Sequence, residues 1–318
     1  MRASVVIPTR DRRPLLLPLL ARVRPEAAAA GAEVVVVDNG SRDGTREAVM
    51  ALALTEGTAL RYVAEPVPGA TRARNAGARA ARGAIVAYVD DDALPARGWL
   101  AALVATFDDP RVGGAGGRVI LRFASAPPPW WDGALADYLA AYDLGPEPLD
   151  LATRPWYDAP RGDNMAFRRD ALLAVGGFDE RLGPRAGRPS VGEESEVCLR
   201  LRAAGWGVRY VPAAAVEHLV DPARLDPAWF LRRAFWTGWS EAMIDRRHRG
   251  LRAALGRFRW HYVPRLSLRR YRPAASVDAD RLLAECRRRE ALGYLRGLAA
   301  GIPRLPALRR ERVLSVAS

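Results

Sequence analysis

The sequence predicts an α/β fold in which a mostly parallel sheet is flanked by helices and followed by a helical C-terminal extension. Through the first 100 residues, short runs rich in Val, Ile and Leu alternate with helix-like stretches, which is the order of a doubly wound sheet. Residues 33–37 read Glu-Val-Val-Val-Val, and such a run is typical of a parallel strand buried on both faces. Beyond about residue 221, Arg, Ala and Leu recur at helical spacing. We therefore expect an α/β region, 1–220, and a basic helical region, 221–318.

The individual elements follow from their apolar patterns and from the turn residues between them. The helix expected at 12–24 has a proline near its first turn, where a missing N–H is tolerated. Residues 124–160 contain many prolines and little periodicity, so they predict a long loop or lid, and regular structure resumes over 163–220. The expected strands are 4–8, 33–37, 60–63 and 84–89, and the expected helices of the first 100 residues are 12–24, one from about 45, and 70–82.

The composition is that of an ordinary globular protein. Of the 318 residues, 49% are apolar and 27% are charged, and no apolar run reaches the roughly 18 residues of a membrane-spanning helix. The N-terminus leads directly into a strand pattern without an apolar leader, so a cytoplasmic location is the default expectation. Cys198 and Cys286 cannot form a disulfide framework and lie in no CxxC pair, which favours simple burial.

The net charge of +13 is concentrated in one part of the chain. All 49 basic residues are Arg, and residues 221–318 hold 22 of them against 9 acidic residues. A region with this excess of positive charge is expected to bind a polyanion. No nucleic-acid-binding motif accompanies it, so nucleic acid is not an expected partner. Two interpretations remain, and we weigh them equally. The region lies on an anionic membrane surface, as a peripheral protein on the inner face of the membrane, or it is a helical subdomain whose aromatic residues pack inward, namely Trp229, Phe230, Phe235, Trp236, Trp239, Trp260 and Tyr262.

Three polar clusters follow predicted strands, where parallel sheets bind ligands. They are Pro8-Thr9-Arg10, Asp38-Asn39-Gly40-Ser41 and Asp90-Asp91-Asp92. Adjacent carboxylates repel one another, and a divalent cation that also bridges phosphate oxygens, Mg²⁺ or Mn²⁺, would make the third cluster tolerable. The alternative is a solvated acidic loop that caps the next helix. The position directly after a buried strand favours the metal site.

Further polar residues gain meaning from that placement. Asp38, at a strand end, can accept hydrogen bonds from a base or a ribose hydroxyl. Arg72 and Arg74 lie on the helix before the acidic strand and are candidates for a diphosphate, since guanidinium pairs with phosphate in a bidentate manner. In a chain with 49 arginines, a solvated surface position is the simpler alternative for each.

Two acidic residues and one histidine complete the candidate set. Glu193 and Glu194 open a predicted helix, where a carboxylate is either a plain cap, stabilised by the helix dipole, or a general base for an acceptor hydroxyl. His218 ends a strand-like run and is either a metal ligand or a donor to a backbone carbonyl. From the residues alone, the cap and the base are equally favoured, and the backbone donor is favoured for His218.

In this order the segments resemble the family-2 inverting glycosyltransferases of the GT-A fold, from residue 4 to about 220. Each segment is weak evidence alone, but five in the right order make a strong signal. The matching segments are SVVIPTRDR (4–12), VVVVDNGSRDGT (34–45), ATRARNAGARAARGAIVAYVDDD (70–92), RGDNMAFRRDALLAVGGFDERLG (161–183) and GEESEVCLRLRAAGWGVRYVPAAAVEH (192–218).

The resemblance implies a role for each matching position. The segments that contain Asp38 and Pro8, Thr9 and Arg10 would hold the nucleoside of a sugar nucleotide linked to UDP, GDP or dTDP. Asp90, Asp91 and Asp92 would face the donor phosphates, and Asp90 and Asp92 would form the DxD motif. Asp92 would be a direct ligand of Mn²⁺ or Mg²⁺, and His218 would complete the metal shell. Asp163, Asn164 and Glu193 would border the acceptor, which is a saccharide or a lipid-linked molecule.

Two departures from the family pattern bear on activity. The family's catalytic helix usually opens Glu-Asp, with Asp as the base, whereas this chain has Glu193-Glu194. Glu194 is one methylene longer and is the expected base. Asp163 stands where a small residue is usual. We expect an inverting, metal-dependent glycosyltransferase of cell-envelope polysaccharide, glycolipid or glycoconjugate synthesis. The alternative is a GT-A-fold scaffold without turnover. A nucleotidyltransferase is a less favoured alternative, because no Gly-rich phosphate-binding loop follows the first strand.

Overall fold

The computed structural model describes residues 1–54, 59–184, 188–267 and 277–300, so part of the basic region expected at 221–318 lies outside the described residues. Within this range the strands form one sheet in the order β3-β2-β1-β4-β8-β6-β9-β5, with β7 paired to β9. The strands are β1 (Ala3–Thr9), β2 (Glu33–Asp38), β3 (Leu60–Ala64), β4 (Ile85–Tyr88), β5 (Ala93–Pro95), β6 (Val112–Phe123), β7 (Leu149–Asp150), β8 (Met165–Arg168) and β9 (Gly207–Val220).

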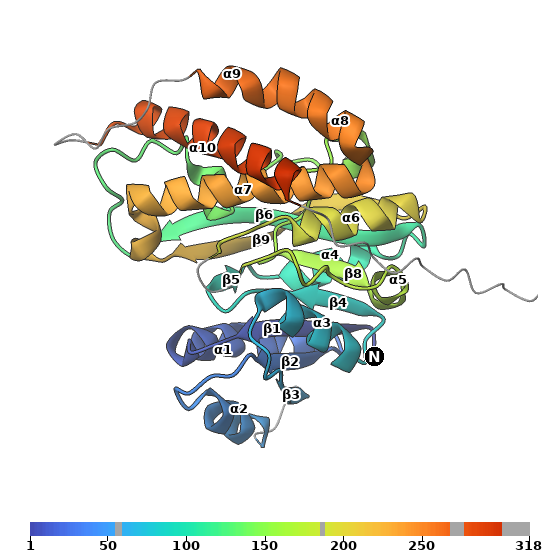
Figure 1. Ribbon diagram of the computed structural model, residues 1–318. Helices are drawn as coiled ribbons and strands as arrows, with labels where there is room; N and C mark the ends of the chain where they lie inside the picture. The colour runs from blue at the N-terminus through green and yellow to red at the C-terminus, as the bar shows by residue number, and fades with distance from the viewer. Residues whose placement is uncertain (55–58, 185–187, 268–276, 301–318) are drawn as a thin grey trace, which may run out of the picture.

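The first half of the sheet is parallel, as the valine-rich runs predict. Strands β3, β2, β1 and β4 run in one direction, and every residue of β1 and β2 is buried. Helices cover both faces, as Figure 1 shows. They are α1 (Arg13–Ala29), α2 (Thr45–Ala53), α3 (Ala70–Ala80), α4 (Trp99–Thr106), α5 (Arg169–Ala174) and α6 (Glu193–Ala203).

The second half of the sheet brings distant segments to the edge where β1 and β4 end. Strand β8 is antiparallel to both β4 and β6, and β9 is parallel to β6. Strand β9 therefore ends at the same edge as β4, while β8 begins there, with Met165 paired to Tyr88. Because of this reversal, the residues before Met165 lie beside the acidic triplet that follows β4. The sequence contains no local signal for that reversal.

Close packing of α3 on the sheet depends on one glycine. A Cβ atom at Gly77 would lie 2.3 Å from Cγ1 of Val6 and 3.2 Å from Cγ2 of Val37. Because real Cβ atoms do not approach other carbons so closely, any larger residue would push α3 away from β1 and β2. The glycine thus sets the position of α3, and with it the position of Arg74.

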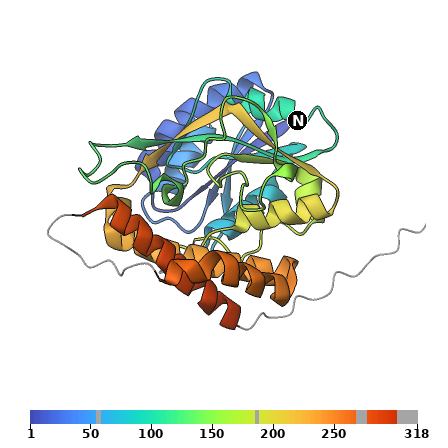
Figure 2. The same cartoon turned by 90° about the horizontal axis from the view of Figure 1, so that it is seen from above.

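The C-terminal helices form a layer beside the sheet (Figures 1 and 2). They are α7 (Pro227–His248), α8 (Gly250–Arg257), the π-helical turn η4 (Phe258–Tyr262), α9 (Val263–Leu266) and α10 (Ala279–Ala299). The backbones of α7 and α10 are in contact, since a Cβ at Gly238 would lie 1.9 Å from the carbonyl oxygen of Glu290. None of the described helices is long and apolar enough to cross a bilayer.

The segment 124–160 is mostly irregular, as expected, with only short 3₁₀ turns (η1, Ala136–Leu139, and η2, Leu151–Thr153) and β7. Leu135 and Leu139 nevertheless join Phe230 in a second hydrophobic core, against which Trp130 and Trp131 pack. The segment is therefore fixed between the sheet and the helical layer along part of its length. Cys198 and Cys286 are both buried and unbonded, as the sequence predicts.

Candidate active site

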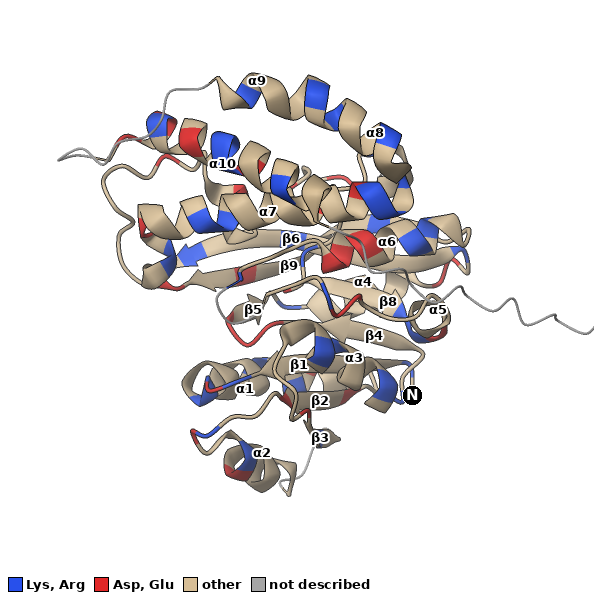
Figure 3. Cartoon of the chain, in the orientation of Figure 1, with Lys and Arg blue, Asp and Glu red and all other residues tan. Residues whose placement is uncertain are grey.

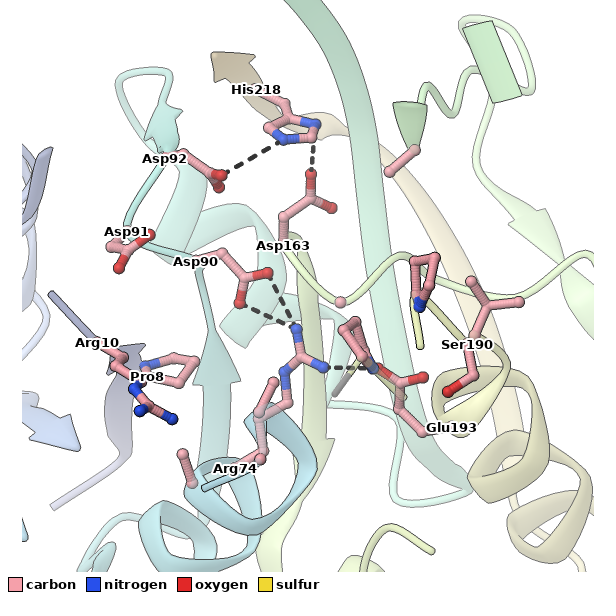
Figure 4. Close-up of a pocket in the computed structure, with 18 of the residues that line it drawn as sticks. Pro8, Arg10, Arg74, Asp90, Asp91, Asp92, Asp163, Ser190, Glu193 and His218 are labelled. Atoms are coloured by element: carbon pink, nitrogen blue, oxygen red, sulfur yellow. Dashed lines mark hydrogen bonds and ion pairs between the residues drawn. The ribbon is translucent and has the colours of Figure 1, made fainter. Parts of the chain in front are cut away.

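The polar clusters predicted from the sequence converge on a cavity of about 610 Å³ at the edge of the sheet where β1, β4 and β9 end. Its wall includes residues from each of the five motif segments, and Figure 4 shows several of them facing one another. The predicted residues that line it are Pro8, Thr9, Arg10, Arg74, Asp90, Asp91, Asp92, Asp163, Glu193, Glu194 and His218.

The three aspartates of the triplet have different partners. Asp90 accepts two hydrogen bonds of 3.0 Å from Nη2 of Arg74. Asp91 accepts from Oγ1 of Thr9 at 2.7 Å and from Nη1 of Arg12 at 3.1 Å. The same Nη1 donates to Asp92 at 2.7 Å. Arginines therefore already offset much of the repulsion that led us to expect a cation at this cluster.

Asp91 and Asp92, the more deeply buried residues of the triplet, differ in their affinity for a proton. Burial raises the pKa of Asp91 to about 6, against the opposing charge of Arg12. Burial alone would also raise the pKa of Asp92, but its pairing with His218, followed by the charges of Arg12 and Arg224, lowers that pKa well below its ordinary value. Asp92 is thus a carboxylate held in its charged form, as an ionic ligand requires.

His218 lies between two carboxylates (Figure 4). Its Nε2 is 3.7 Å from Asp92 and its Nδ1 is 3.5 Å from Asp163. Nδ1 also lies 3.0 Å from the carbonyl oxygen of Leu139. Because a carbonyl can only accept, Nδ1 carries the proton of that hydrogen bond. Nε2 faces Asp92, and the pairing that lowers the pKa of Asp92 places a second proton on Nε2, which a bound metal would displace. A backbone carbonyl that fixes the histidine tautomer in this way is the usual support of a metal-binding imidazole.

Asp163 is the least satisfied of these groups. It is buried, and neither of its carboxylate oxygens has a hydrogen-bond donor within the described residues. Burial raises its pKa to about 7, the charge of His218 opposes the shift, and Asp90 and Asp92 add to it. A buried carboxylate without a donor is costly, and a cation held near Asp92 and His218 would relieve that cost. Asp92 and His218 are the two protein groups that would hold such a cation, and a carboxylate ligand suits Mn²⁺ or Mg²⁺.

The protein groups do not enclose a metal by themselves. Across the described part of the chain, no three His, Cys, Asp or Glu side chains converge closely enough to hold an ion. Mg²⁺-type sites commonly use only one or two carboxylates of the protein and complete their coordination with substrate phosphates and water, so the side chains present would supply only part of a metal's coordination.

Arg74 connects the acidic triplet to α6. Its side chain is 4% exposed, and Nη1 donates to Oε1 of Glu193 at 2.8 Å while Nη2 holds Asp90. Burial and the neighbouring charge of Glu194 raise the pKa of Glu193, although Arg74 opposes the shift. Arg74 was expected to face a diphosphate. In the structure it is instead committed to these two carboxylates, as Figure 4 shows.

Glu194 lies at the start of α6 and lines the cavity. The backbone of Gly162 lies against it, so that a Cβ at Gly162 would come within 2.7 Å of Oε1 of Glu194 and 2.5 Å of Nη2 of Arg74. The helix opens from Gly192, whose φ of +94° is unfavourable for other residues. These two glycines bring the Glu194 carboxylate to the cavity wall.

Three predicted site residues do not line the cavity. Asp38 accepts from Tyr62 and from the backbone of Ser41, both at 2.8 Å, beside a separate hollow of about 330 Å³. Arg72 pairs with Glu180 at 2.9 Å. Asn164 is fully buried between strands and α4.

In each case a residue one or two positions away lines the cavity instead: Asn39 instead of Asp38, Arg74 instead of Arg72, and Asp163 instead of Asn164. Successive side chains of an extended chain point to opposite sides, which separates Asp38 from Asn39 at the end of β2, and residues two apart on a helix do not share a face. Asp163 and Asn164 lie in the turn that precedes β8. Each of these segments therefore contributes to the cavity wall, but through a neighbouring side chain.

The structure also adds cavity residues that the motifs did not reveal, three of them arginines. Arg12 bridges Asp91 and Asp92, and Arg224 lies 3.6 Å from Asp92. Arg233 comes from α7, and its burial lowers its pKa to about 10. Arg12 lies within the first matching segment and could have been named from it. Arg224 and Arg233 belong to the basic region, where the charge pattern alone does not separate them from solvated arginines.

Comparison with known proteins decides the family. The model described as Glycosyl transferase family 2 matches residues 4–175, which is more than half of the chain. The chain belongs to glycosyl transferase family 2. It is 29% identical over 179 residues to the glucosyl-dolichyl phosphate glucuronosyltransferase of Haloferax volcanii, covering 56% of each chain. It is 31% identical over 248 residues to the pre-mycofactocin glycosyltransferase of Mycobacterium tuberculosis, covering 77% of this chain and 48% of that protein. The family-2 chain thus spans about half the length of these relatives.

Solved structures confirm the predicted fold class. The mannosyltransferase PcManGT from Pyrobaculum calidifontis, in complex with GDP-Man and Mn²⁺, superposes with a TM-score of 0.55 at 24% identity, covering 95% of this chain and 76% of that chain. S. aureus TarS gives a TM-score of 0.52 at 17% identity, covering 92% of this chain and 54% of that chain. At these identities the likeness shows the fold, including the combination of a mostly parallel sheet with C-terminal helices.

Proposed function

We propose that this family-2 protein is an inverting, metal-dependent glycosyltransferase that moves a sugar from a nucleoside diphosphate to an acceptor hydroxyl. The observation that carries the proposal is the single cavity that contains the Asp90–Asp92 loop, the Asp163–His218 pair and the Glu194 carboxylate. Displacement at a sugar carbon requires groups that stabilise the departing phosphate and a group that accepts the proton of the acceptor hydroxyl.

The donor side of the cavity has a wall for the nucleoside and arginine side chains for the diphosphate. Pro8, Thr9 and Arg10 extend the end of β1 into the cavity and form the wall for the nucleoside. Arg224 and Arg233 are the candidates for the leaving diphosphate, a role that we give them in place of Arg72 and Arg74. Guanidinium groups pair with phosphate in a bidentate geometry, and burial strengthens that pairing.

Asp92 and the Nε2 atom of His218 would hold the divalent metal, with Asp163 beside them. When bound, Mn²⁺ or Mg²⁺ acts as a Lewis acid that offsets the charge of the diphosphate leaving group. Asp90 would hold Arg74 in place, and Asp91 would hold Thr9 and Arg12, so that the loop keeps its shape around the donor.

Glu194 is the proposed general base. A bond forms between the acceptor oxygen and the anomeric carbon, the bond from that carbon to the phosphate oxygen breaks, and the acceptor proton passes to the Glu194 carboxylate. Attack opposite to the leaving group inverts the configuration. Glu193, whose pKa is raised by burial and by Glu194, would line the acceptor end with Asp163.

The acceptor is proposed to be a saccharide or a lipid-linked molecule of cell-envelope or glycoconjugate synthesis, used from the cytoplasmic side. The name of the Haloferax relative refers to a glucosyl-dolichyl phosphate acceptor, which supports a lipid-linked substrate here. The donor nucleoside is left to experiment among UDP, GDP and dTDP.

A thermal-shift panel of UDP, GDP and dTDP, each with and without Mn²⁺, tests the donor site. A ligand present at about 100 times its Kd adds roughly 2.7 kcal/mol to the free energy of unfolding, so one nucleotide with Mn²⁺ should raise the Tm by several degrees. Asp92→Asn should abolish the Mn²⁺-dependent part of that shift. The matched control Asp108→Asn, at an exposed ion pair with Arg2, should leave it intact. If no nucleotide raises the Tm with Mn²⁺, the proposal fails.

Turnover separates an enzyme from a scaffold that binds nucleotide without reacting. With the donor from the panel, Glu194→Gln should lower kcat by about 10²-fold or more, as loss of a general base does, and should leave the nucleotide-induced Tm shift unchanged. Nucleotide binding without hydrolysis or transfer of the sugar nucleotide, in the parent protein with Mn²⁺, would favour the scaffold.

A further inference from the structure

The outermost helices of the C-terminal layer expose a set of large apolar side chains. Leu251 and Leu255 of α8 are 51% and 50% exposed, Trp260 of η4 is 77% exposed, and Val263 of α9 is 44% exposed. The opposite side of the same segment is buried, with Tyr262 at 1%, and packs on α7 and α10. We call the outward side of residues 250–266 the α8–α9 face.

The exposure is not a general property of this protein's surface. Among the described residues, eleven large apolar side chains are more than 40% exposed, and four of these eleven lie within 13 positions on the α8–α9 face. Clustered exposed apolar residues mark an interaction surface, whereas single ones need no explanation. The face therefore requires a partner that accepts apolar side chains.

The charge around these side chains identifies the kind of partner. The described residues 246–267 contain seven Arg and neither Asp nor Glu, and Figure 3 shows only basic charges along α8 and α9. Some of these arginines point inward, since Arg257 pairs with Asp245 and Glu241. Arg252 and Arg259 are exposed, and neither pairs with an acid among the described residues. Arg259 lies over the ring of Trp260 at 5.2 Å.

We propose that the α8–α9 face docks on the surface of an anionic phospholipid bilayer. Leu251, Leu255, Trp260 and Val263 would enter the boundary between headgroups and acyl chains, while Arg252 and Arg259 would contact lipid phosphates. Exposed apolar and aromatic residues flanked by arginines are the pattern of helices that lie in the bilayer interface. A second copy of the chain fits less well, because an isologous dimer would bring together two faces whose charged residues are all basic.

The docking face is connected to the wall of the cavity. Tyr138, which lines the cavity, donates to Oε1 of Glu290 on α10 at 2.7 Å. Oε2 of the same Glu290 accepts from Arg265 on α9. Docking would therefore hold the cavity wall at a defined orientation to the bilayer, which suits an acceptor anchored in lipid. This last step rests on the proposed function, whereas the docking itself does not.

Vesicle flotation of the full chain tests the docking. One set of vesicles is phosphatidylcholine alone, and the other contains about 30% phosphatidylglycerol. We expect binding only to the anionic vesicles, weakened by salt because exposed charges are screened. Arg252→Gln with Arg259→Gln should weaken binding about 25-fold, since each Arg near an anionic surface contributes a factor of about five. The control Arg82→Gln with Arg97→Gln removes the same charge from exposed positions outside the helical layer and should have much less effect.

A second pair of substitutions tests the apolar part of the face. Leu255→Ser with Trp260→Ser should weaken vesicle binding at least about tenfold at unchanged net charge, because both side chains would lose their burial in the bilayer. All variants should keep the parent Tm, since the altered side chains are exposed, and should keep the nucleotide-induced Tm shift. That second readout separates a failure of docking from a failure of the proposed glycosyl transfer.

Two results would overturn the docking proposal. One is the absence of charge-dependent vesicle binding by the parent protein. The other is a dimer, seen by sedimentation velocity in the absence of lipid, that Leu255→Ser with Trp260→Ser converts to a monomer. The latter would assign the α8–α9 face to self-association.

Discussion

Replacing Asn164 by alanine should destabilise the fold without changing the chemistry. Asn164 is fully buried. Its Oδ1 accepts from Nε1 of Trp99 at 2.8 Å, and its Nδ2 donates to the carbonyl oxygens of Arg118 and Ala214 at 2.9 and 2.7 Å. Alanine cannot form any of these three hydrogen bonds, so all three partner groups lose the bond to residue 164. At about 1 kcal/mol for each lost hydrogen bond, with a further cost for the unsatisfied groups and the space left behind, the loss is about 3–5 kcal/mol.

Urea denaturation, followed by circular dichroism, measures that loss. The matched variant is Asn39→Ala, because Asn39 also makes three hydrogen bonds, to the backbone of Glu65, Val67 and Gly69, but lines the cavity. Both variants should unfold at lower urea concentration, and only Asn39→Ala should also weaken nucleotide binding. If Asn164→Ala keeps the parent stability and raises the KM for the acceptor, Asn164 is an acceptor-binding residue and the structural reasoning is wrong.

Three further predictions concern packing, a buried ion pair and a proton. Gly238→Ala should cost at least about 2 kcal/mol by pushing α7 from α10, whereas Gly256→Ala, with nothing within 4 Å, should stabilise by up to about 1 kcal/mol. Arg74→Met should cost about 3–5 kcal/mol because it leaves the buried Glu193 carboxylate and the partly buried Asp90 carboxylate unpaired. Arg72→Met, at a partly exposed pair, should cost less than about 1 kcal/mol. Burial raises the pKa of Glu290 from 4.5 to about 7. Between these two values the folded protein keeps a proton on Glu290 that the unfolded chain loses. The free energy of unfolding should therefore fall as pH rises from about 4.5 to 7.

Denaturant titrations of each variant, with Glu290→Gln measured across that pH range, check these expectations. Equal costs for the two glycine substitutions would refute the α7–α10 contact. Equal costs for the two arginine substitutions would show that Arg74 is not a buried link. A parent protein and a Glu290→Gln variant with the same pH dependence would mean that Glu290 is not the group that titrates.

Much of the fold could be predicted because its elements carry local signals. The valine run of β2 leaves no polar face, so it had to be a strand buried on both sides, and the expected strands 4–8, 60–63 and 84–89 coincide with β1, β3 and β4. The insertion of β8 between β4 and β6, antiparallel to both, has no such signal. It depends on hydrogen bonds between residues far apart in the chain.

The site was predictable to the level of segments, and less so at single residues. The rule that ligands bind at the carboxyl ends of parallel strands located Asp90–Asp92, and the motif order located Glu194 and His218. It did not tell Asp163 from Asn164, because which of two neighbours faces the cavity depends on how the chain enters β8.

The sequence by itself determined the fold class, the family resemblance and the segments that could carry chemistry, because strand periodicity and motif order are local properties. Only the tertiary structure decided which charges meet. It committed Arg74 to Asp90 and Glu193, brought Arg224 and Arg233 from the basic region to the cavity, and left Trp260 exposed on the α8–α9 face. Pairing and exposure depend on distances between residues that are remote in sequence, and those distances are set when the helices pack against the sheet.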